Sequence, residues 1–201
     1  MNGKFFDLKK EKQDRMINAA LKVFAMQGYR HASTDAVVQE AGISKGLLFH
    51  YFESKLGVYT FVYDYSVRFM TLELKSAVDP GETDLFGLMK QVEMAHMQAM
   101  KGYPYMQQFL NRCMSENVSE ALLAIEEKRE AINELYERIY SQADWSRLSG
   151  GVDGEKLHKM LDLTIKGLMS ERFQEGSFQP EMLFEEISEY LDMMKAIVCR
   201  Q

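Results

Sequence analysis

The segment "STDAVVQEAGISKGLLFHYFESK", residues 33–55, contains two short helical patterns joined by a three-residue turn. Ser33 and Ser44 each stand where a helix N-cap is favoured, because a serine hydroxyl accepts a hydrogen bond from a free backbone N–H of the first turn. Gly42 supplies the turn, whose backbone conformation residues with a side chain adopt reluctantly. Two helices joined in this way form a helix-turn-helix. The segment therefore predicts this motif, with "KGLLFHYF" as its second helix.

The residues before this segment predict a first helix that packs on the motif. It runs from about Leu8 to Gln27, and Gly28 stands where a C-terminal cap is favoured. Apolar side chains recur at helical spacing on both sides of the turn. The small core that we expect combines Ala20, Val23 and Phe24 with Val37, Val38, Ala41, Ile43, Leu48 and Phe52.

Helical periodicity continues through the rest of the chain. Further helices are predicted over about 54–78, 83–101, 119–143, 155–174 and 180–199, with one more starting at "GYPY" (102–105). The breaks fall at "DPGET" (79–83) and at the glycine-rich "RLSGGVDG" (147–154). No strand-like alternation of useful length occurs. The sequence therefore predicts an all-α protein of about nine helices, with a three-helix domain over residues 1–53 and a six-helix domain over residues 54–201.

Composition is that of a globular protein without a membrane span. Of the 201 residues, 46% are hydrophobic and 27% are charged, and no run of about 18 apolar residues occurs. The N-terminal stretch lacks the apolar core of a signal peptide. Cys113 and Cys199 have no motif spacing, which favours reduced thiols. These features predict a cytoplasmic protein.

Charge is unevenly distributed along the chain. Residues 1–55 hold nine lysines and arginines against six acidic residues, whereas the other 146 residues hold 15 against 24. A basic front on an acidic body is compatible with a module that binds a polyanion.

The stretch "FAMQGYRHASTDAVVQEAGISKGLLFHYFESKLGVY" (24–59) resembles the DNA-binding segment of TetR-family transcriptional regulators. The shared pattern is an aromatic-Ala-x-x-Gly-Tyr, then Ser-Thr, Ala-Gly-Ile-Ser-Lys-Gly, His-Tyr-Phe and Ser-Lys. The likeness covers about a quarter of the chain. It implies a DNA-binding domain, dimerisation through the last two helices, and a ligand pocket between the fourth and seventh helices.

The second helix of the motif is expected to enter the major groove, while neighbouring groups hold phosphates. Leu48 and Phe52 are predicted to face inward, and Lys45, Gly46, Leu47 and His50 are predicted to lie on the exposed side. Gly46 is predicted to allow close approach to the duplex. Leu47 and Phe49 depart from the family pattern, which mostly has a small residue and a tyrosine there, and packing by Phe49 remains an alternative. The predicted DNA-contacting residues are Ser33, Thr34, Ser44, Lys45, Gly46, Leu47, Phe49, His50, Tyr51 and Lys55.

Six methionines fall between residues 89 and 114, and methionine suits adaptable apolar surfaces as well as ordinary cores. Arg129 interrupts an apolar stripe, where it could anchor an acidic ligand group or extend its charged end to solvent. The pocket candidates are Tyr65, Met89, His96, Met97, Met100, Tyr105, Phe109, Cys113 and Arg129.

One helix-turn-helix reads only a short half-site, so specific binding normally needs two copies. Gly167 is small enough to let helices cross closely, although the apolar residues around it could instead form the core of a single chain. The dimer candidates are Leu161, Ile165, Gly167, Leu168, Leu183, Ile187, Leu191 and Met194.

The resulting prediction is a ligand-responsive repressor that binds a palindromic operator as a homodimer. Its expected partners are duplex DNA, a second copy of itself and a small apolar or amphipathic effector, with no cofactor, metal or membrane. One alternative is an adaptor whose acidic body binds a protein and whose helix-turn-helix is inactive. Another is a helical-bundle metalloenzyme built on Glu93/His96 and Glu155/His158, which have the spacing of di-iron ligands. The place of Glu155 in a first turn after a glycine-rich loop argues against it.

Overall fold

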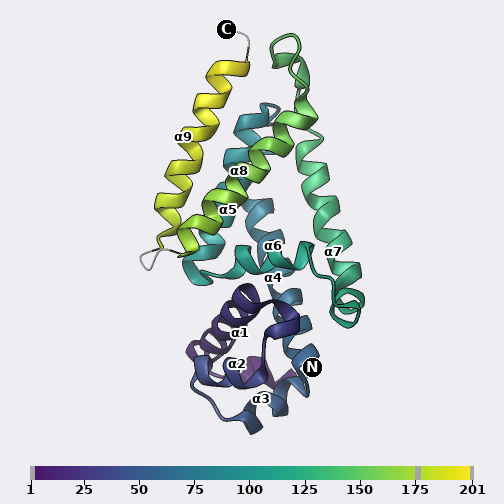
Figure 1. The fold of residues 1–201 in the computed structure, drawn as a ribbon, viewed down its shortest axis with the longest axis vertical. Helices are drawn as coiled ribbons and strands as arrows, with labels where there is room; N and C mark the ends of the chain where they lie inside the picture. The colour runs from purple at the N-terminus through teal and green to yellow at the C-terminus, as the bar shows by residue number, and fades with distance from the viewer. Residues whose placement is uncertain (1–2, 175–177, 200–201) are drawn as a thin grey trace. The chain divides into compact units, whose positions relative to one another are not determined.

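The computed structural model describes residues 3–174 and 178–199, and within these ranges it contains nine α-helices and no β-strand (Figure 1). This confirms the predicted all-α class. Two short 3-10 helices accompany them, η1 (Gly3–Asp7) and η2 (Trp145–Arg147). The α-helices are α1 (Lys10–His31), α2 (Thr34–Ala41), α3 (Lys45–Phe52), α4 (Lys55–Ala77), α5 (Leu85–Gly102), α6 (Met106–Met114), α7 (Ser119–Tyr140), α8 (Gly154–Gln174) and α9 (Pro180–Val198).

The chain divides into two compact units. One comprises the residues up to Thr71 together with Gly102–Asn133, and the other comprises Leu72–Lys101 and the residues from Glu134 onward. The first unit includes α6, because α6 packs along α1. The division therefore does not follow the predicted domain boundary between residues 53 and 54, which stays a prediction about function.

The first unit is built around α1, whose inner face is buried, with Ala20 at 1%, Val23 at 6% and Phe24 at 2% exposure. Val37 and Ala41 of α2 are at most 1% exposed where α2 packs on α1, and α3 packs in turn on α2. Figure 1 shows α1, α2 and α3 gathered together. The Phe24 ring meets the rings of Tyr59 and Phe109, with centroids 5.1 and 6.3 Å away. Aromatic packing therefore joins α1, α4 and α6.

Gly28 interrupts α1 and turns the chain toward α2. Its φ of 68° and ψ of 170° lie outside the helical region, although His31 is still assigned to the helix. A Cβ atom at this position would stand 2.8 Å from Nε of Arg112, whose guanidinium lies against the glycine. The predicted end of the first helix is therefore confirmed, and α6 packs directly on this corner.

The second unit is held together by apolar stripes and by a buried carboxylate. Leu85, Leu88 and Val92 of α5 are at most 4% exposed. Asp84 directly precedes α5, and its carboxylate accepts a hydrogen bond from the backbone N–H of Gly87 at 2.9 Å. The same carboxylate forms an ion pair with Lys195 of α9 at 2.8 Å. A helix N-terminus favours such a negative charge. This contact ties the start of α5 to the end of α9. Among the described residues, none of the helices is both long and apolar enough to cross a membrane.

Replacing each glycine of the helix-turn-helix region by alanine tests these turns. Gly42 has φ 60° and ψ 44° with open space around it, so Gly42→Ala is expected to cost about 1 kcal/mol of folding stability. Gly28 has an extended ψ at positive φ, a region almost restricted to glycine, so Gly28→Ala is expected to cost about 2–3 kcal/mol and to displace Arg112. Denaturant unfolding measures both values, and equal losses would contradict this account.

Candidate nucleic-acid interface

The second helix of the motif presents one face to solvent. Lys45, Gly46 and His50 are exposed, while Leu48 is 1% exposed and Phe52 is 6% exposed. The predicted orientation of α3 is therefore confirmed. Leu47 and Phe49 are half-buried, so each has part of its side chain in the fold and part at the surface. The exposed face combines the positive charge of Lys45, the imidazole of His50 and, at Gly46, backbone that carries no side chain.

Serine hydroxyls cap the three helices that surround this face. Ser33 Oγ accepts a hydrogen bond from the backbone N–H of Ala36 at 3.1 Å, and Ser44 Oγ accepts one from Leu47 at 3.2 Å. Ser54 Oγ accepts one from Gly57 at 3.0 Å. The two predicted N-caps are confirmed, and Ser54 caps α4 in the same way. Contacts of Ser33, Ser44 and the half-buried Thr34 with phosphate stay predictions.

The two candidate lysines are held by weak contacts. Lys45 Nζ lies 2.7 Å from a carboxylate oxygen of Asp35, and both side chains are more than half exposed. Lys55 Nζ lies 4.5 Å from the centroid of the Tyr29 ring and 3.5 Å from the carbonyl oxygen of Arg30. An exposed ion pair contributes at most about 1 kcal/mol. A phosphate could therefore replace Asp35 as the partner of Lys45 at little cost.

The corner between α3 and α4 is tightly built. Glu53 has φ 65°, a left-handed value that side chains rarely adopt. A Cβ atom on Gly57 would overlap the carbonyl oxygen of Phe52. This close approach fixes the end of α3 against the first turn of α4, where Lys55 stands. Sequence reasoning did not identify Gly57, although a glycine at the start of a long helix was a visible signal.

Tyr51 is more deeply packed than its predicted role suggests. It is only 8% exposed, and its ring contacts those of His50 and Phe5, with centroids 4.9 and 5.6 Å away. A phosphate contact is therefore restricted to the small part of Tyr51 left at the surface, and it stays a prediction. Phe5 was not anticipated at all. The available signal was a pair of phenylalanines in an otherwise polar N-terminal stretch.

The DNA-binding segment has recognisable relatives. A family model for bacterial regulatory proteins of the tetR family matches residues 16–59. The chain is 41% identical over 49 residues to TtgW, an uncharacterized HTH-type transcriptional regulator of Pseudomonas putida, covering 24% of this chain and 37% of that protein. It is 41% identical over 59 residues to YuxN, an uncharacterized HTH-type transcriptional regulator of Bacillus subtilis, covering 27% and 20%. The aligned part of the chain thus spans between a fifth and two fifths of the length of these curated relatives.

The whole fold also has solved counterparts. A TetR family transcriptional regulator from Chloroflexus aurantiacus superposes with a TM-score of 0.64 at 20% identity, covering 98% of this chain and 97% of that one. Residues 16–59 match the tetR family model, and the fold of the whole chain is similar to that of this solved regulator. Sequence places the DNA-binding segment in the family, and the fold extends the likeness to the remaining helices.

Two pocket candidates, Phe109 and Cys113, belong to a packed core. Phe109 is 1% exposed, and its ring contacts those of Tyr59 and Tyr63, with centroids 5.6 and 6.2 Å away. Cys113 Sγ lies 3.2 Å from the hydroxyl of Tyr59, and burial raises the pKa of this thiol to about 12. The thiol is therefore protonated and unreactive at neutral pH. The charge of Arg129 opposes the rise in the pKa of Tyr63 that burial causes, which places this half-buried arginine near that phenol.

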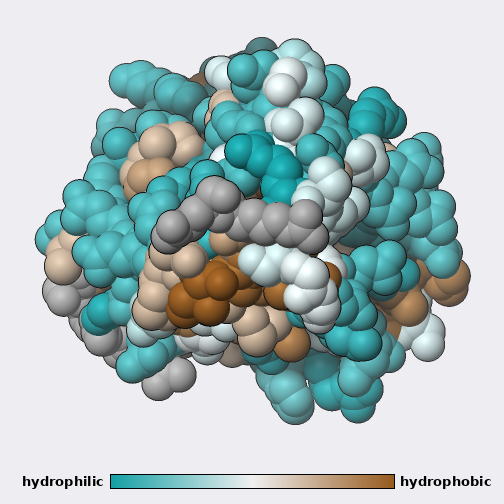
Figure 2. Space-filling model, turned by 90° about the horizontal axis from the view of Figure 1, so that it is seen from above, coloured by the Kyte–Doolittle hydropathy of each residue, from teal (hydrophilic) through white to brown (hydrophobic). Residues whose placement is uncertain are grey.

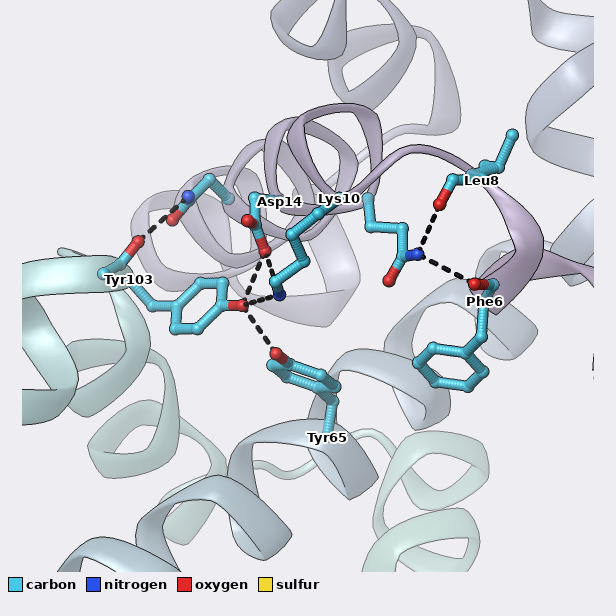
Figure 3. Close-up of polar contacts among 9 residues, drawn as sticks. Phe6, Leu8, Lys10, Asp14, Tyr65 and Tyr103 are labelled. Carbon is cyan, nitrogen blue, oxygen red and sulfur yellow. Dashed lines mark hydrogen bonds and ion pairs between the residues drawn. The ribbon is translucent and has the colours of Figure 1, made fainter.

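Tyr65 is engaged in a polar network (Figure 3). Its hydroxyl lies 2.5 Å from that of Tyr103, which donates to Asp14 at 2.7 Å and accepts from Lys10 Nζ at 3.1 Å. Burial raises the pKa of Tyr103, with the hydrogen bonds to Tyr65 and Asp14 adding to it. The phenol therefore keeps its proton at physiological pH. The network links α1 to α4 and to the residue that follows α5.

His96 forms a buried polar group in the second unit. Its Nε2 lies 2.8 Å from the hydroxyl of Tyr136, and its Nδ1 lies 3.2 Å from a carboxylate oxygen of Glu93. Burial, followed by the negative charge of Glu93, raises the pKa of Tyr136. A protonated phenol can donate to Nε2 while Nδ1–H donates to Glu93, so a neutral imidazole satisfies both neighbours.

The remaining pocket candidates are buried or half-buried. Met89, Met97 and Met100 are buried, and Tyr105 is half-buried. A hollow of about 510 Å³ lies elsewhere, between α1 and α2, lined by Lys22, Val23, Met26, Gln27, Ala36, Gln39 and Glu40. The predicted ligand pocket therefore stays a prediction.

The structure gives no support to the metalloenzyme alternative. Glu155 is exposed, and His158 packs against Tyr140 with ring centroids 4.1 Å apart and the ring planes tilted by 50°. Within the residues that the structure describes, no three His, Cys, Asp or Glu side chains are grouped so as to hold a metal ion. The bonds of His96 to Glu93 and Tyr136 are those of a structural core histidine.

The dimer candidates stay a prediction, but most of them are already buried within one chain. Five of them are buried within the chain, where α8 and α9 pack on each other. These five are between 1% and 7% exposed: Leu161, Ile165, Leu183, Ile187 and Leu191. Leu168 and Met194 are half-buried, and Gly167 is exposed with open space around its Cα. Which residues of these helices face a second copy stays a prediction.

Gly46 allows folding and DNA binding to be measured separately. An added Cβ atom would meet nothing within 4 Å, and the residue is helical, so Gly46→Ala is expected to stabilise the fold by about 0.5–1 kcal/mol. The same methyl group would stand between α3 and a duplex, so DNA affinity is expected to fall at least about tenfold, equal to about 1.4 kcal/mol. Thermal unfolding and fluorescence anisotropy provide the two readouts. Unchanged affinity in a stabilised variant would remove Gly46 from the interface.

Proposed function

We propose that this chain is a DNA-binding transcriptional regulator that acts as a homodimer on a palindromic operator and represses transcription. The observation that carries the proposal is the outward face of α3, where Lys45, Gly46 and His50 are exposed between three serine-capped helix ends. Base edges in the major groove are accessible to such a helix, and backbone N–H groups at helix ends favour phosphate. The matched tetR segment, residues 16–59, contains all of these groups.

An apolar surface on the last two helices supports the dimer. Large apolar side chains are exposed there at helical spacing, and a monomer gains nothing from leaving them in water. Gly167, on the same exposed side of α8, would allow close helix approach. The view in Figure 2 shows hydrophobic patches on a surface that is otherwise mostly hydrophilic. The exposed residues are Met160 (48%), Leu163 (60%), Met182 (59%), Tyr190 (39%), Met193 (51%) and Ile197 (67%).

An apolar or amphipathic effector is proposed to switch DNA affinity. The polar network of Tyr65, Tyr103, Asp14 and Lys10 offers a route, because it joins α4 and the start of the α5–α6 connection to α1. A shift of α4 or α6 would have to break these bonds or carry α1 with it. Coupling of about 1–3 kcal/mol between effector and operator would change operator affinity roughly five- to 150-fold.

The proposal is tested by selecting duplexes from a randomised library with the wild-type protein. The selected sites are expected to contain an inverted repeat whose half-sites lie about one helical turn, roughly 34–36 Å, apart. Lys45→Ala combined with Lys55→Ala should then reduce affinity for the selected duplex at least about 100-fold, because a dimer loses four charged contacts.

The matched control replaces two exposed lysines of the second unit, Lys75→Ala with Lys159→Ala, and is expected to bind like the wild type. Anisotropy titrations at fixed salt compare the proteins. Failure to enrich any sequence would favour the adaptor alternative, and equal losses in both double variants would make the DNA attraction a matter of net charge alone.

The dimer surface is tested by Leu163→Glu. In a two-fold interface the substitution occurs twice, so the dimer is expected to lose about 3–6 kcal/mol and dissociate at micromolar concentration. Leu123→Glu on α7, where the side chain is 72% exposed, is the matched control and should leave the oligomer intact. Light scattering coupled to gel filtration measures the mass of each variant. A Leu163→Glu protein that keeps the dimer mass would exclude this face of α8.

A further inference from the structure

The N-terminal 3-10 helix, η1, packs on α3, the helix proposed to enter the major groove. Phe5 has 0% exposure, and its ring meets those of Tyr51 and Phe52 on α3, with centroids 5.6 and 5.3 Å away. The ring of Phe61 on α4 lies 4.9 Å away on the same cluster. A phenylalanine buried among three aromatic rings fixes the backbone on either side of it. The segment Gly3–Asp7 therefore has a defined place next to the helix proposed to enter the major groove.

A second contact holds the other end of this segment. Gln13 of α1 is 8% exposed, and its side-chain amide donates to the carbonyl oxygens of Phe6 at 3.0 Å and Leu8 at 2.7 Å (Figure 3). These bonds satisfy two backbone acceptors where the chain leaves η1 and enters α1. The 3-10 helix is thus fastened to α3 through Phe5 and to α1 through Gln13.

This arrangement places a positive charge beside α3. Lys4 directly precedes Phe5 and is exposed. The exposed His50 is also in ring contact with Tyr51, so Tyr51 contacts both the outward face of α3 and the 3-10 helix. Phosphates line both sides of a major groove, and a cation fixed at the flank of a recognition helix is suited to meet one of them.

We propose that the segment Gly3–Asp7 is part of the DNA-binding surface, with Lys4 contacting a backbone phosphate beside the half-site and Phe5 positioning it. This inference rests on the proposed DNA-binding function. The contact carries no sequence information, because a phosphate is the same beside every base pair. Anchoring by Phe5 lowers the conformational entropy that Lys4 loses on binding, which a lysine on an unstructured tail would lose in full.

The experiment uses the full-length protein and a random-sequence duplex of about 30 base pairs, so that no operator needs to be known. Affinity is measured from about 50 to 300 mM KCl, and the slope of log affinity against log salt counts the phosphates contacted, at about 0.9 per phosphate. Lys4→Ala is expected to reduce the slope by about 1.8 for a dimer, which loses one contact per protomer. Lys4→Arg should keep the wild-type slope, and Lys75→Ala, an exposed lysine of the second unit, should also keep it.

The positioning role of Phe5 is tested with a double-variant comparison. Phe5→Ala should lower the slope as much as Lys4→Ala, and combining the two should lower it no further, because a detached segment no longer presents the lysine. Phe5→Leu keeps an apolar anchor and is expected to restore the slope. Additive losses in the double variant would overturn the positioning role, and thermal unfolding of each variant separates it from loss of the folded protein.

The two proposals fail in different ways. If Lys4→Ala leaves the slope unchanged while the wild type binds the duplex with a steep salt dependence, the 3-10 helix is not part of the interface and DNA binding stands. If the wild-type protein shows no salt-dependent affinity for duplex DNA, the proposed function fails and the inference fails with it.

Discussion

The aromatic packing around Phe24 is the contact on which the rest of the first unit depends. Its ring meets Tyr59 of α4 and Phe109 of α6, and it stacks on Tyr29 at 6.4 Å, just beyond the turn at Gly28. Rings of this size bury large apolar areas and favour the tilted and edge-on arrangements seen here. One cluster thereby fixes the end of α1, the start of α4 and the position of α6. The helix α1 of the DNA-binding region and the helices α4 and α6, which are proposed to respond to an effector, thus pack in the same aromatic cluster.

This shared core gives the proposed switch its physical basis. Close-packed side chains do not deform continuously, so a change at α6 is passed on to α1 or is absorbed by broken contacts. The guanidinium of Arg112 against Gly28 and the hydroxyl of Tyr103 on Asp14 are two such contacts at different points along α1. The hydrogen bond from Asn18 to the carbonyl oxygen of Gly102 is a third. Together they leave α1 little freedom to move independently of the α5–α6 connection.

Local features of this fold, such as helix caps and turns, could be predicted from the sequence, whereas contacts between residues far apart in the sequence could not. The caps at Ser33 and Ser44 and the turn at Gly42 depend on neighbouring residues only, so their residue types were sufficient. Phe5 carries no local signal of its destination, because its partners lie about 46 to 56 residues further along the chain. The tetrad of Lys10, Asp14, Tyr65 and Tyr103 was hidden for the same reason.

The dimer candidates on α8 and α9 could not be separated from core residues by sequence for a related reason. Both helices are apolar on more than one side, and periodicity shows that a stripe is buried without showing which partner buries it. Leu161 and Leu191 lie inside their own chain, while Leu163 and Met193, two residues away on each helix, are at least half exposed. A residue two positions along a helix points to a substantially different side. The amino-acid types were the same on both sides, so only the fold could assign them.

Two features of α3 and of the residue that follows it lower the folding stability of the chain. A glycine in a helix costs about 0.5–1 kcal/mol relative to alanine, yet Gly46 fills no tight space in the isolated chain. Glu53 holds a left-handed backbone conformation that costs on the order of 1 kcal/mol, directly between α3 and the cap of α4. Neither feature improves the packing of a single chain. Both become intelligible if a duplex must approach the backbone of α3 and if the start of α4, with Lys55, must be held at a fixed angle to it.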